Sequence, residues 1–299
     1  ARDKSDIKWV YSVECDTQPF APPLRVFEKV EHPPKVVIAG AGPAGLFCAL
    51  RLIDHGIAPV ILERGKAVEE REQDVRKFCE TGMLDPDSNV QFGEGGAGAF
   101  SDGKLNTQTN DTRNRDVLDT FVRFGAPEEV GYLGKPHVGS DNLKRVVANI
   151  RAHILRSGGE FRFCERLTDV RLHGGRLEAV ITTRGEIACD ALVLAVGHSA
   201  RDTFEMLLAR GFVMEQKEFA VGVRIEHLES SIGRAQYGAG YAALPAADYK
   251  LVSHASDRAV FTFCMCPGGV VIPSASEAGG VVTNGMSNYA RSERNANSA

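Results

Sequence analysis

A glycine-rich turn near the start of the chain has the residue types and spacing that bind a nucleotide pyrophosphate. Residues 40–45 read GAGPAG, which matches G-x-G-x-x-G, and they follow the apolar run 35–39. In this pattern Gly40 permits a tight turn and Gly42 lets the backbone approach a pyrophosphate, while Gly45 allows close packing of helix on sheet. The N-terminus of that helix then faces the phosphates. The motif predicts a dinucleotide site.

An acidic residue follows at the spacing expected for ribose binding. Glu63 comes 18 residues after Gly45, at the end of the second predicted strand. A carboxylate there can accept hydrogen bonds from both hydroxyls of an adenosine ribose, and it would repel a 2′-phosphate, which argues against NADP at this site. A glycine turn without a ligand is the alternative, and the strand before the motif and the helix after it disfavour that interpretation.

Two further segments match the same glycine pattern in other contexts. Residues 93–98 (GEGGAG) follow no buried strand and lead into a turn at 101–103, so they form either a flexible surface loop or backbone lying close against a flat cofactor. Residues 238–243 (GAGYAA) lack a preceding strand and meet Pro245. We expect no second nucleotide motif in the chain.

Other residues that could do chemistry carry weaker signals. His198 follows the apolar run 191–196, at the sheet edge where doubly wound folds place ligands, although a helix-capping or hydrogen-bonded structural histidine is the alternative. Cys264 and Cys266 have neither the spacing of a redox disulfide nor a partner pair for a metal, and alternate residues of a strand point to opposite faces. We expect two buried thiols and no metal site.

Composition excludes several classes of protein. With 299 residues, 43% hydrophobic and 25% charged, the chain is globular and long enough for about two domains. A net charge of −4 leaves no electrostatic footprint for nucleic acid or an anionic membrane. The seven cysteines have no framework spacing, which indicates a reducing compartment, and the uncharged run 36–50 is too short to span a bilayer. We expect a cytoplasmic protein whose partner is a small molecule; its oligomeric state is left open.

Hydrophobic periodicity predicts the elements that position these motifs. Predicted strands lie at 7–13, 35–39, 59–62, 191–196, 219–225, 259–264 and 269–272, and predicted helices at 44–55, 66–80, 114–124, from Asp141 and from Ser199. Asp141 and Ser199 are expected to cap their helices. Between them, the short strands 160–164, 167–172, 177–183 and 187–190 are expected to form an antiparallel meander.

This order predicts an α/β fold, a Rossmann-like nucleotide-binding domain with a β-meander and an inserted β-rich substrate domain. We place an N-terminal extension or the tail of a preceding domain at 1–33, the cofactor domain at 34–211 and a β-rich substrate or cap domain at 212–299. Because the chain starts at Ala1 rather than Met and stops at Ala299 without a closing element, we expect it to be a fragment, incomplete at its C-terminus.

The cofactor itself is indicated by a resemblance. VVIAGAGPAGLFCAL together with VILERG resembles the FAD-binding start of the glutathione-reductase-like, two-dinucleotide-domain flavoproteins. Four longer segments resemble a narrower family of FAD-dependent dehydrogenases or oxidoreductases of unassigned substrate. They are NVQFGEGGAGAFSDGKLNT (89–107), GHSARDTFEML (197–207), FCMCPGG (263–269) and TNGMSNYARSERNANSA (283–299).

The resemblance implies roles for individual residues. Gly40, Gly42, Pro43, Ala44 and Gly45 would line the pyrophosphate, Glu63 would hold the ribose, Arg64 would lie beside the adenine, and Gly95, Gly96, Lys104 and Gly197 would lie on the flavin side. His198, Glu94 and Lys104 are candidate general bases by position only. One departure stands out, because nothing after Gly197 fits the late strand–glycine–acid–helix segment with which this superfamily completes its cofactor site.

The expected function is that of an FAD-dependent oxidoreductase that transfers a hydride through its flavin on a small molecule. NAD(P)H is a candidate electron donor. The alternatives are a flavin-dependent RNA-modifying protein and a non-catalytic or incomplete FAD-binding module.

Overall fold

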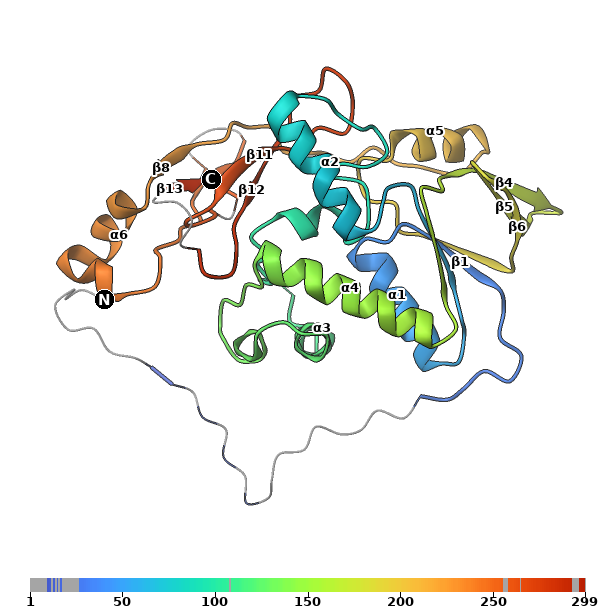
Figure 1. Cartoon of the computed structure of the whole chain (residues 1–299), viewed down its shortest axis with the longest axis horizontal. Coiled ribbons are helices and arrows are strands. Elements are labelled where there is room, and N and C mark those ends of the chain that lie inside the picture. Colours follow the sequence, from blue (N-terminus) through green and yellow to red (C-terminus); the bar gives the residue numbers. More distant parts are fainter. Residues whose placement is uncertain are drawn as a thin grey trace.

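The structure is a computed structural model of the chain (Figure 1). It describes residues 10, 11, 13, 15, 17 and 27–298, apart from 108, 255–257, 264 and 292–295. The strand predicted at 7–13 lies partly outside the described residues, and it is wrong for Val10, Tyr11 and Val13, which are irregular and exposed.

A four-stranded parallel sheet forms the centre of the fold, in the order β3-β2-β1-β7. The strands are β1 (Val36–Ala39), β2 (Val60–Glu63), β3 (Glu160–Phe163) and β7 (Ala191–Leu194). Helix α1 (Pro43–Asp54) connects β1 to β2 and ends before Gly56, whose φ of +81° is left-handed. This βαβ unit and the parallel sheet confirm the predicted Rossmann-like α/β class.

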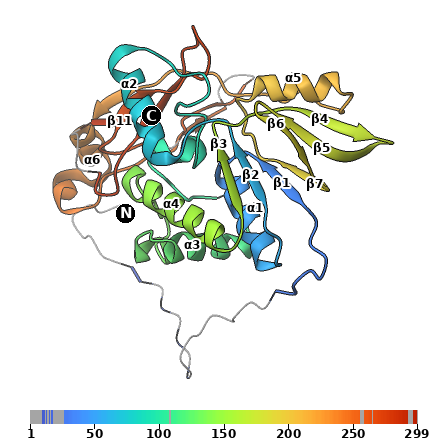
Figure 2. The same ribbon diagram turned by 45° about the vertical axis from the view of Figure 1, so that its right-hand side comes forward.

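The parallel sheet has α1 and α4 on one side and the meander on the other (Figure 2), and alternate residues of β1 face these two layers. Val36 and Ile38 belong to the core that the sheet shares with α1 and α4 (Ser140–Arg156). Val37 and Ala39 pack on the opposite side, in a smaller core shared with the meander. Because both sides of β1 are covered, its sequence is apolar throughout rather than alternating.

Helices α2, α3 and α4 confirm three further predictions. Helix α2 spans Val68–Thr81, α3 spans Arg113–Arg123, and α4 buries an apolar stripe against the sheet, formed by Leu143, Val146, Val147, Ile150 and Ile154. Two 3₁₀ turns, η1 (Gly96–Phe100) and η2 (Glu128–Gly131), lie between them.

The meander contains three strands rather than four. Strands β4 (Leu167–His173), β5 (Arg176–Thr182) and β6 (Gly185–Ala188) pair antiparallel. The first strand predicted for it, β3, instead extends the parallel sheet beside β2. Period-two patterning identifies a strand but not its partner, and the long helix α4 before β3 acts as a crossover that makes parallel pairing possible.

After β7 the chain forms α5 (Arg201–Ala209) and then a region of short elements. These are β8 (Glu226–Leu228), α6 (Glu229–Tyr237), η3 (Gly238–Ala243), β9 (Val252–Ser253), β10 (Val260–Phe261), β11 (Val270–Pro273), β12 (Thr283–Met286) and β13 (Ala296–Ser298). They pair as three two-stranded sheets, and α6 and the β8–β13 sheet lie at the end of the molecule opposite the meander (Figure 1).

The strand predicted at 219–225 and two predicted helix caps are wrong, and the strand predicted at 259–264 is partly right. Residues 219–225 form no strand, and Phe219 and Val221 stay 86% and 84% exposed; among the described residues of 259–264, only those of β10 are regular. Asp141 lies inside α4 and accepts from the Tyr289 N–H, while Ser199 precedes an α5 whose N-cap is Ala200. An apolar run without an available partner and an Asp or Ser near a helix start do not by themselves fix the local structure.

Among the described helices, none combines the length and the apolar character needed to cross a bilayer.

Candidate functional site

A cavity of about 450 Å³ opens at the carboxyl ends of β1, β2 and β7, where α1 begins. This is the edge at which doubly wound folds bind ligands, and the volume is in the range of small-molecule sites. The predicted site residues that line it are Gly40, Gly42, Pro43, Ala44, Glu63, Arg64, Gly96, Gly197 and His198. The predicted residues Gly45, Gly95, Glu94 and Lys104 are not part of the lining.

The three glycines of the motif at 40–45 have different structural roles. A Cβ at Gly40 would lie 2.3 Å from the Ala195 carbonyl oxygen, and one at Gly45 would lie 1.9 Å from the Gly40 oxygen, so the fold itself requires both. A Cβ at Gly42 would meet nothing closer than the Gly96 Cα, at 3.9 Å. The protein does not need glycine at that position for its own packing, so Gly42 keeps space open in the cavity.

Helix α1 begins without a capping side chain. Its N-cap is Gly42, which has no side chain to accept a hydrogen bond from the first turn. Pro43 occupies the first helical position, where a backbone N–H is not needed. The first backbone N–H groups of a helix have no partner within the helix, and they carry the positive end of its dipole. Because Gly42, Pro43 and Ala44 line the cavity, this helix end presents an anion-binding surface to it.

The second glycine segment packs against the first. The Gly95 N–H donates to the Ala41 carbonyl oxygen at 2.8 Å, and a Cβ at Gly96 would lie 3.3 Å from the Gly42 Cα. Residues Gly93 and Gly95 are buried. Of the two interpretations left open by the sequence, the flexible surface loop is therefore wrong: residues 93–96 are packed backbone that forms one wall of the cavity.

The Glu63 carboxylate joins both glycine segments. One oxygen accepts from the Ala41 N–H at 2.8 Å, and the other accepts from Gly65 at 3.0 Å and Gly93 at 2.9 Å. A carboxylate has about four lone-pair positions, so these three donors leave room for roughly one more. Glu63, which the sequence predicts to bind a ribose, therefore has a structural role that the spacing of the motif did not reveal.

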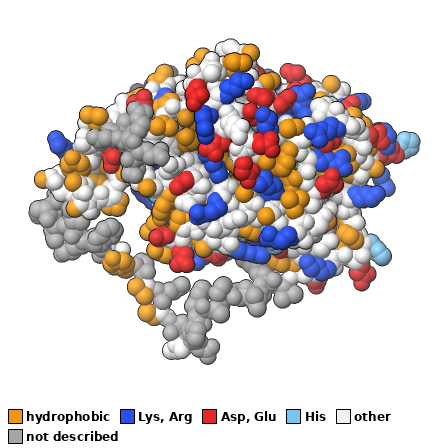
Figure 3. All heavy atoms as spheres, in the orientation of Figure 1, with side chains coloured by type: hydrophobic (Ala, Val, Ile, Leu, Met, Phe, Trp, Pro, Cys, Tyr) orange, Lys and Arg blue, Asp and Glu red, His pale blue; other side chains and the backbone are white. Residues whose placement is uncertain are grey.

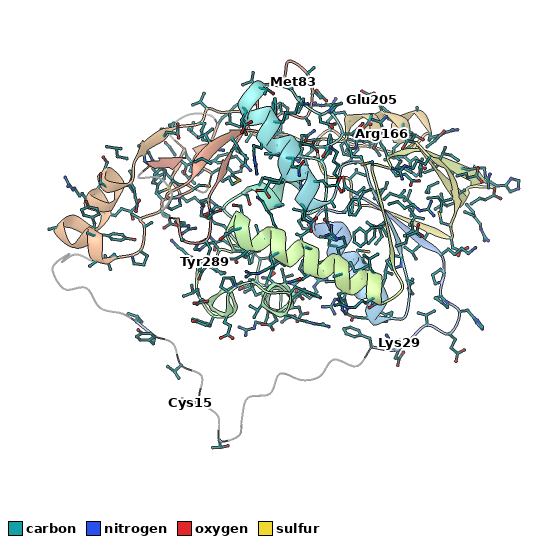
Figure 4. The ribbon with its side chains drawn as sticks, in the orientation of Figure 1. Cys15, Lys29, Met83, Arg166, Glu205 and Tyr289 are labelled. Atoms are coloured by element: carbon teal, nitrogen blue, oxygen red, sulfur yellow. The ribbon has the colours of Figure 1, made fainter. Side chains whose placement is uncertain are left out.

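Arg64 lines the cavity and is held in a fixed orientation. Its guanidinium stacks over the Phe92 ring at 4.2 Å and donates to both oxygens of Asp202 in α5, at 2.7 and 2.9 Å. Arg166, labelled in Figure 4, lies 3.3 Å from the carboxylates of both Asp87 and Asp202. These contacts connect the end of β2 to α5 and set two arginines around the opening.

Arg71 is a functional candidate that the sequence analysis missed. It is fully buried in α2, and its guanidinium donates only to backbone carbonyls, those of Asn89, Val90, Glu94 and Gly96. Burial lowers its pKa to about 10, against the opposing effect of nearby carboxylates. The signal was present, because Arg71 shares the buried face of α2 with Val68 and Val75.

Glu94 is buried beside the cavity wall rather than in the cavity. Its Oε2 accepts from the Val68 N–H at 2.9 Å and from Arg151 at 2.6 Å, while Oε1 is buried without a partner. Burial raises the pKa of Glu94 to about 7, although Arg151 and the Val68 N–H act to lower it. Glu94 holds the second glycine segment to α2 and α4.

Lys104 belongs to a different cluster, at the junction with the C-terminal region. Its ammonium lies 2.7 Å from Asp102 and donates to the Met265 carbonyl, and Asp102 also binds Ser287 and, at 2.6 Å, Arg291. Tyr289 (Figure 4) stacks on His137 with ring centres 5.0 Å apart. Nearby, Cys266 is buried as predicted, while Cys264 lies outside the described residues.

Residues within the described part of the chain offer no cluster of three or more His, Cys, Asp or Glu side chains for a metal ion.

Comparison with known proteins finds a family match for part of the chain and a relative for all of it. Residues 218–299 match the family described as FAD-dependent protein, C-terminal domain-like. The whole chain is 46% identical over 321 residues to an "Uncharacterized protein" of Clostridium beijerinckii, and it spans 60% of the length of that relative.

Solved structures show weaker similarity. The chain resembles Thermovibrio ammonificans THI4, with 18% identity and a TM-score of 0.39, covering 60% of this chain and 64% of that one. It also resembles glycine oxidase from Bacillus cereus, with 17% identity and a TM-score of 0.32, covering 59% and 58% respectively.

Proposed function

We propose that this chain binds FAD and acts as an FAD-dependent oxidoreductase on a small molecule, with the adenosine diphosphate half of the cofactor in the cavity at the start of α1. The observation that carries the proposal is the pair of facing glycines, Gly42 and Gly96, beside an uncapped helix N-terminus. Because neither glycine has a side chain, backbone alone borders the cavity there and an anionic group can approach it closely, whereas a side chain at Gly42 would occupy that space.

The other lining residues fit the same cofactor. One remaining lone-pair position on Glu63 would accept from a ribose hydroxyl, and Arg64 and Arg166 would lie around the adenine at the cavity mouth. The positive end of α1 would stabilise the pyrophosphate charge without a metal ligand or a lysine. The match of residues 218–299 to an FAD-dependent family supports FAD over other dinucleotides.

When bound, a flavin supplies hydride transfer, for which the protein provides orientation and electrostatics. The packed second glycine segment excludes water from one side of the cavity, and Glu63 keeps this wall in register with the first glycine loop. His198 lines the cavity near its opening and is a candidate to hold a proton there. Lys104 and Glu94 are engaged elsewhere, which makes them weaker candidates for a general base.

Charge distribution bears on the RNA-modifying alternative. On the face shown in Figure 3, the charged side chains lie mainly over the centre and right, where Lys and Arg are interspersed with Asp and Glu. RNA binding draws on clustered positive charge, so this face offers no support for that function.

An absorption spectrum of the purified chain tests the proposal. We expect flavin bands, a released cofactor that elutes as FAD rather than FMN, and bleaching under anaerobic conditions by a reductant, with NADH and NADPH tried first as candidate donors. A chain that neither retains FAD nor binds added FAD would refute the proposal. Retained FAD that resists every reductant would instead favour a non-catalytic FAD-binding module.

A further inference from the structure

Arg71 is unusual because its whole guanidinium is buried and donates hydrogen bonds to a single stretch of backbone, residues 89–96. Nε donates to Asn89 O at 2.7 Å, Nη2 donates to Val90 O at 2.8 Å, and Nη1 donates to both Glu94 O at 2.7 Å and Gly96 O at 2.9 Å. The side chain also lies against Phe100, 4.7 Å from the ring centre, and against Gly93. One side chain therefore fixes both ends of the segment 89–96.

The two bonds of Nη1 determine which way two peptide units face. The described chain has no cis peptide bond, and in a planar trans peptide the C=O and N–H point in opposite directions. The Glu94 carbonyl points at Arg71, and the N–H of the same peptide, that of Gly95, points away and reaches Ala41 O at 2.8 Å. The first glycine loop thus lies on the side away from Arg71.

The same geometry applies to the peptide between Gly96 and Ala97, whose carbonyl oxygen also accepts a hydrogen bond from Arg71. The Gly96 carbonyl also points at Nη1, so the N–H of that peptide, carried by Ala97, points away from Arg71. Both Gly96 and Ala97 line the cavity, and Gly96 lies against Gly42. The Ala97 N–H is therefore directed to the side on which the anion-binding end of α1 lies.

We propose that Arg71 is a positioning residue of the cofactor site: it does not line the cavity, and it holds the 94–97 backbone so that the Ala97 N–H faces the pyrophosphate. The inference rests on the proposed function for the identity of the anion. Arginine suits the task because its rigid fork can donate to several carbonyls at once, whereas lysine has one point charge on a flexible stem.

Equilibrium titrations with FAD, ADP and adenosine test this role. Because adenosine lacks the pyrophosphate, displacement of the Ala97 N–H should weaken only the other two ligands. We expect Arg71→Met and Arg71→Lys to raise the Kd for FAD and ADP on the order of tenfold or more, with the Kd for adenosine unchanged. Arg76→Met, an exposed arginine of the same helix, is the matched control and should change none of the three.

A second readout follows the backbone directly. Amide hydrogen exchange at Gly95 should accelerate in Arg71→Met, while amides in the middle of α1 keep their protection. If Arg71→Met fails to fold, Gly93→Ala perturbs the same contact from the loop side, because its Cβ would lie 2.3 Å from Arg71 Cδ at a φ of +121°. That variant should raise the Kd for FAD and ADP by a larger factor than the Kd for adenosine, whose ribose would share Glu63 with the Gly93 N–H.

The outcomes separate the two proposals. Equal losses for all three ligands, or unchanged ADP affinity with Gly95 still protected, would overturn the positioning role. A wild-type chain that binds ADP but not FAD would refute the proposed function and leave the ADP-to-adenosine comparison as the test of Arg71. A wild-type chain that binds none of the three would overturn both.

Discussion

The Gly95 N–H donates to the Ala41 carbonyl oxygen at 2.8 Å, joining two glycine segments that are far apart in the sequence. The Glu63 carboxylate reinforces the junction by accepting from Ala41 on one side and Gly93 on the other. The cavity wall is thus backbone held by backbone and by one buried acid. Such a wall tolerates little movement, which is what a site for a pyrophosphate requires.

Gly42→Val should abolish cofactor binding without unfolding the chain. The nearest neighbour of a Cβ at residue 42 would be Gly96 Cα, at 3.9 Å, which is ordinary van der Waals contact, and the methyl groups beyond it would extend into the cavity that Gly42 lines. We expect no retained FAD and a far-ultraviolet circular dichroism spectrum like that of the wild type. Gly98→Ala is the control, because a Cβ there meets nothing within 4 Å and Gly98 does not line the cavity. Normal FAD content in Gly42→Val would exclude Gly42 from the site.

The βαβ unit of β1, α1 and β2 could be predicted because its signals are local. A continuous apolar run, a glycine motif and an amphipathic stretch follow one another between residues 35 and 63, and each constrains the next. The stripe on α4 was equally clear. The strand with which β3 pairs could not be predicted from local signals. Nothing in residues 160–163 indicates that they pair with β2 rather than with the next strand. Long-range pairing depends on where the crossover helix returns the chain.

The same distinction between local signals and long-range contacts applies to the candidate site. The spacing of Gly40, Gly42 and Glu63 placed these residues in one cavity. The second glycine segment could not be assigned, because its contacts come from Arg71 and Glu63, which are distant in sequence. The sequence did not reveal that Lys104 pairs with Asp102 at the junction with the C-terminal region, and its expected place on the flavin side stays a prediction. A motif fixes the chemistry of its own residues but not the partners of the loops around it.

Glu63→Gln should weaken FAD binding and also lower stability. An amide has a single acceptor oxygen, so its NH₂ group must face at least one of the N–H groups of Ala41, Gly65 and Gly93. Leaving a buried donor unsatisfied costs about 1–3 kcal/mol. We expect the melting temperature to fall and the Kd for FAD to rise on the order of tenfold. Glu72→Gln, at a half-buried acid in α2 that pairs with Lys144, is a suitable control. An unchanged melting temperature would contradict the structural role of Glu63.

Asp102→Asn should loosen the C-terminal region from the parallel-sheet domain. Asp102 is 3% exposed and binds Lys104, Ser287 and Arg291, so removal of its charge leaves two cations without their shared partner. Loss of one member of a buried ion pair costs about 3–5 kcal/mol. We expect a lower midpoint in urea and faster proteolysis after β11.

The dependence of stability on pH in the acid range is a second test of the role of Asp102. Although burial acts to raise its pKa, the hydrogen bonds and charges of Arg291 and Lys104 lower it from 3.8 to about 2. The stability it contributes is therefore complete above about pH 4 and is lost as the pH falls toward 2. Asp119→Asn is the control, because Asp119 also pairs with an arginine, Arg115, but on the exposed surface of α3. If both variants behave alike, the junction does not depend on Asp102.

Glu94 should make the stability of the chain fall as the pH rises toward neutrality. Its pKa in the folded chain, about 7, is above the ordinary value of 4.5 because burial penalises the ionised form, and Oε1 has no partner. Between these values the folded state binds more protons than the unfolded state, so the free energy of unfolding decreases with pH, by at most about 1.4 kcal/mol per unit.

Glu94→Gln should remove that part of the pH dependence, because the amide does not titrate. The groups facing residue 94 are Arg151 from α4, Glu69 from α2 and Glu63 from β2, and their own charges remain in the variant. Urea unfolding of both chains at pH 5, 6, 7 and 8 gives the comparison. The difference in unfolding free energy between wild type and variant should shift in favour of the variant as the pH rises through about 7. Parallel curves over the whole range would show that Glu94 stays ionised in the folded protein, with Arg151 compensating for its burial.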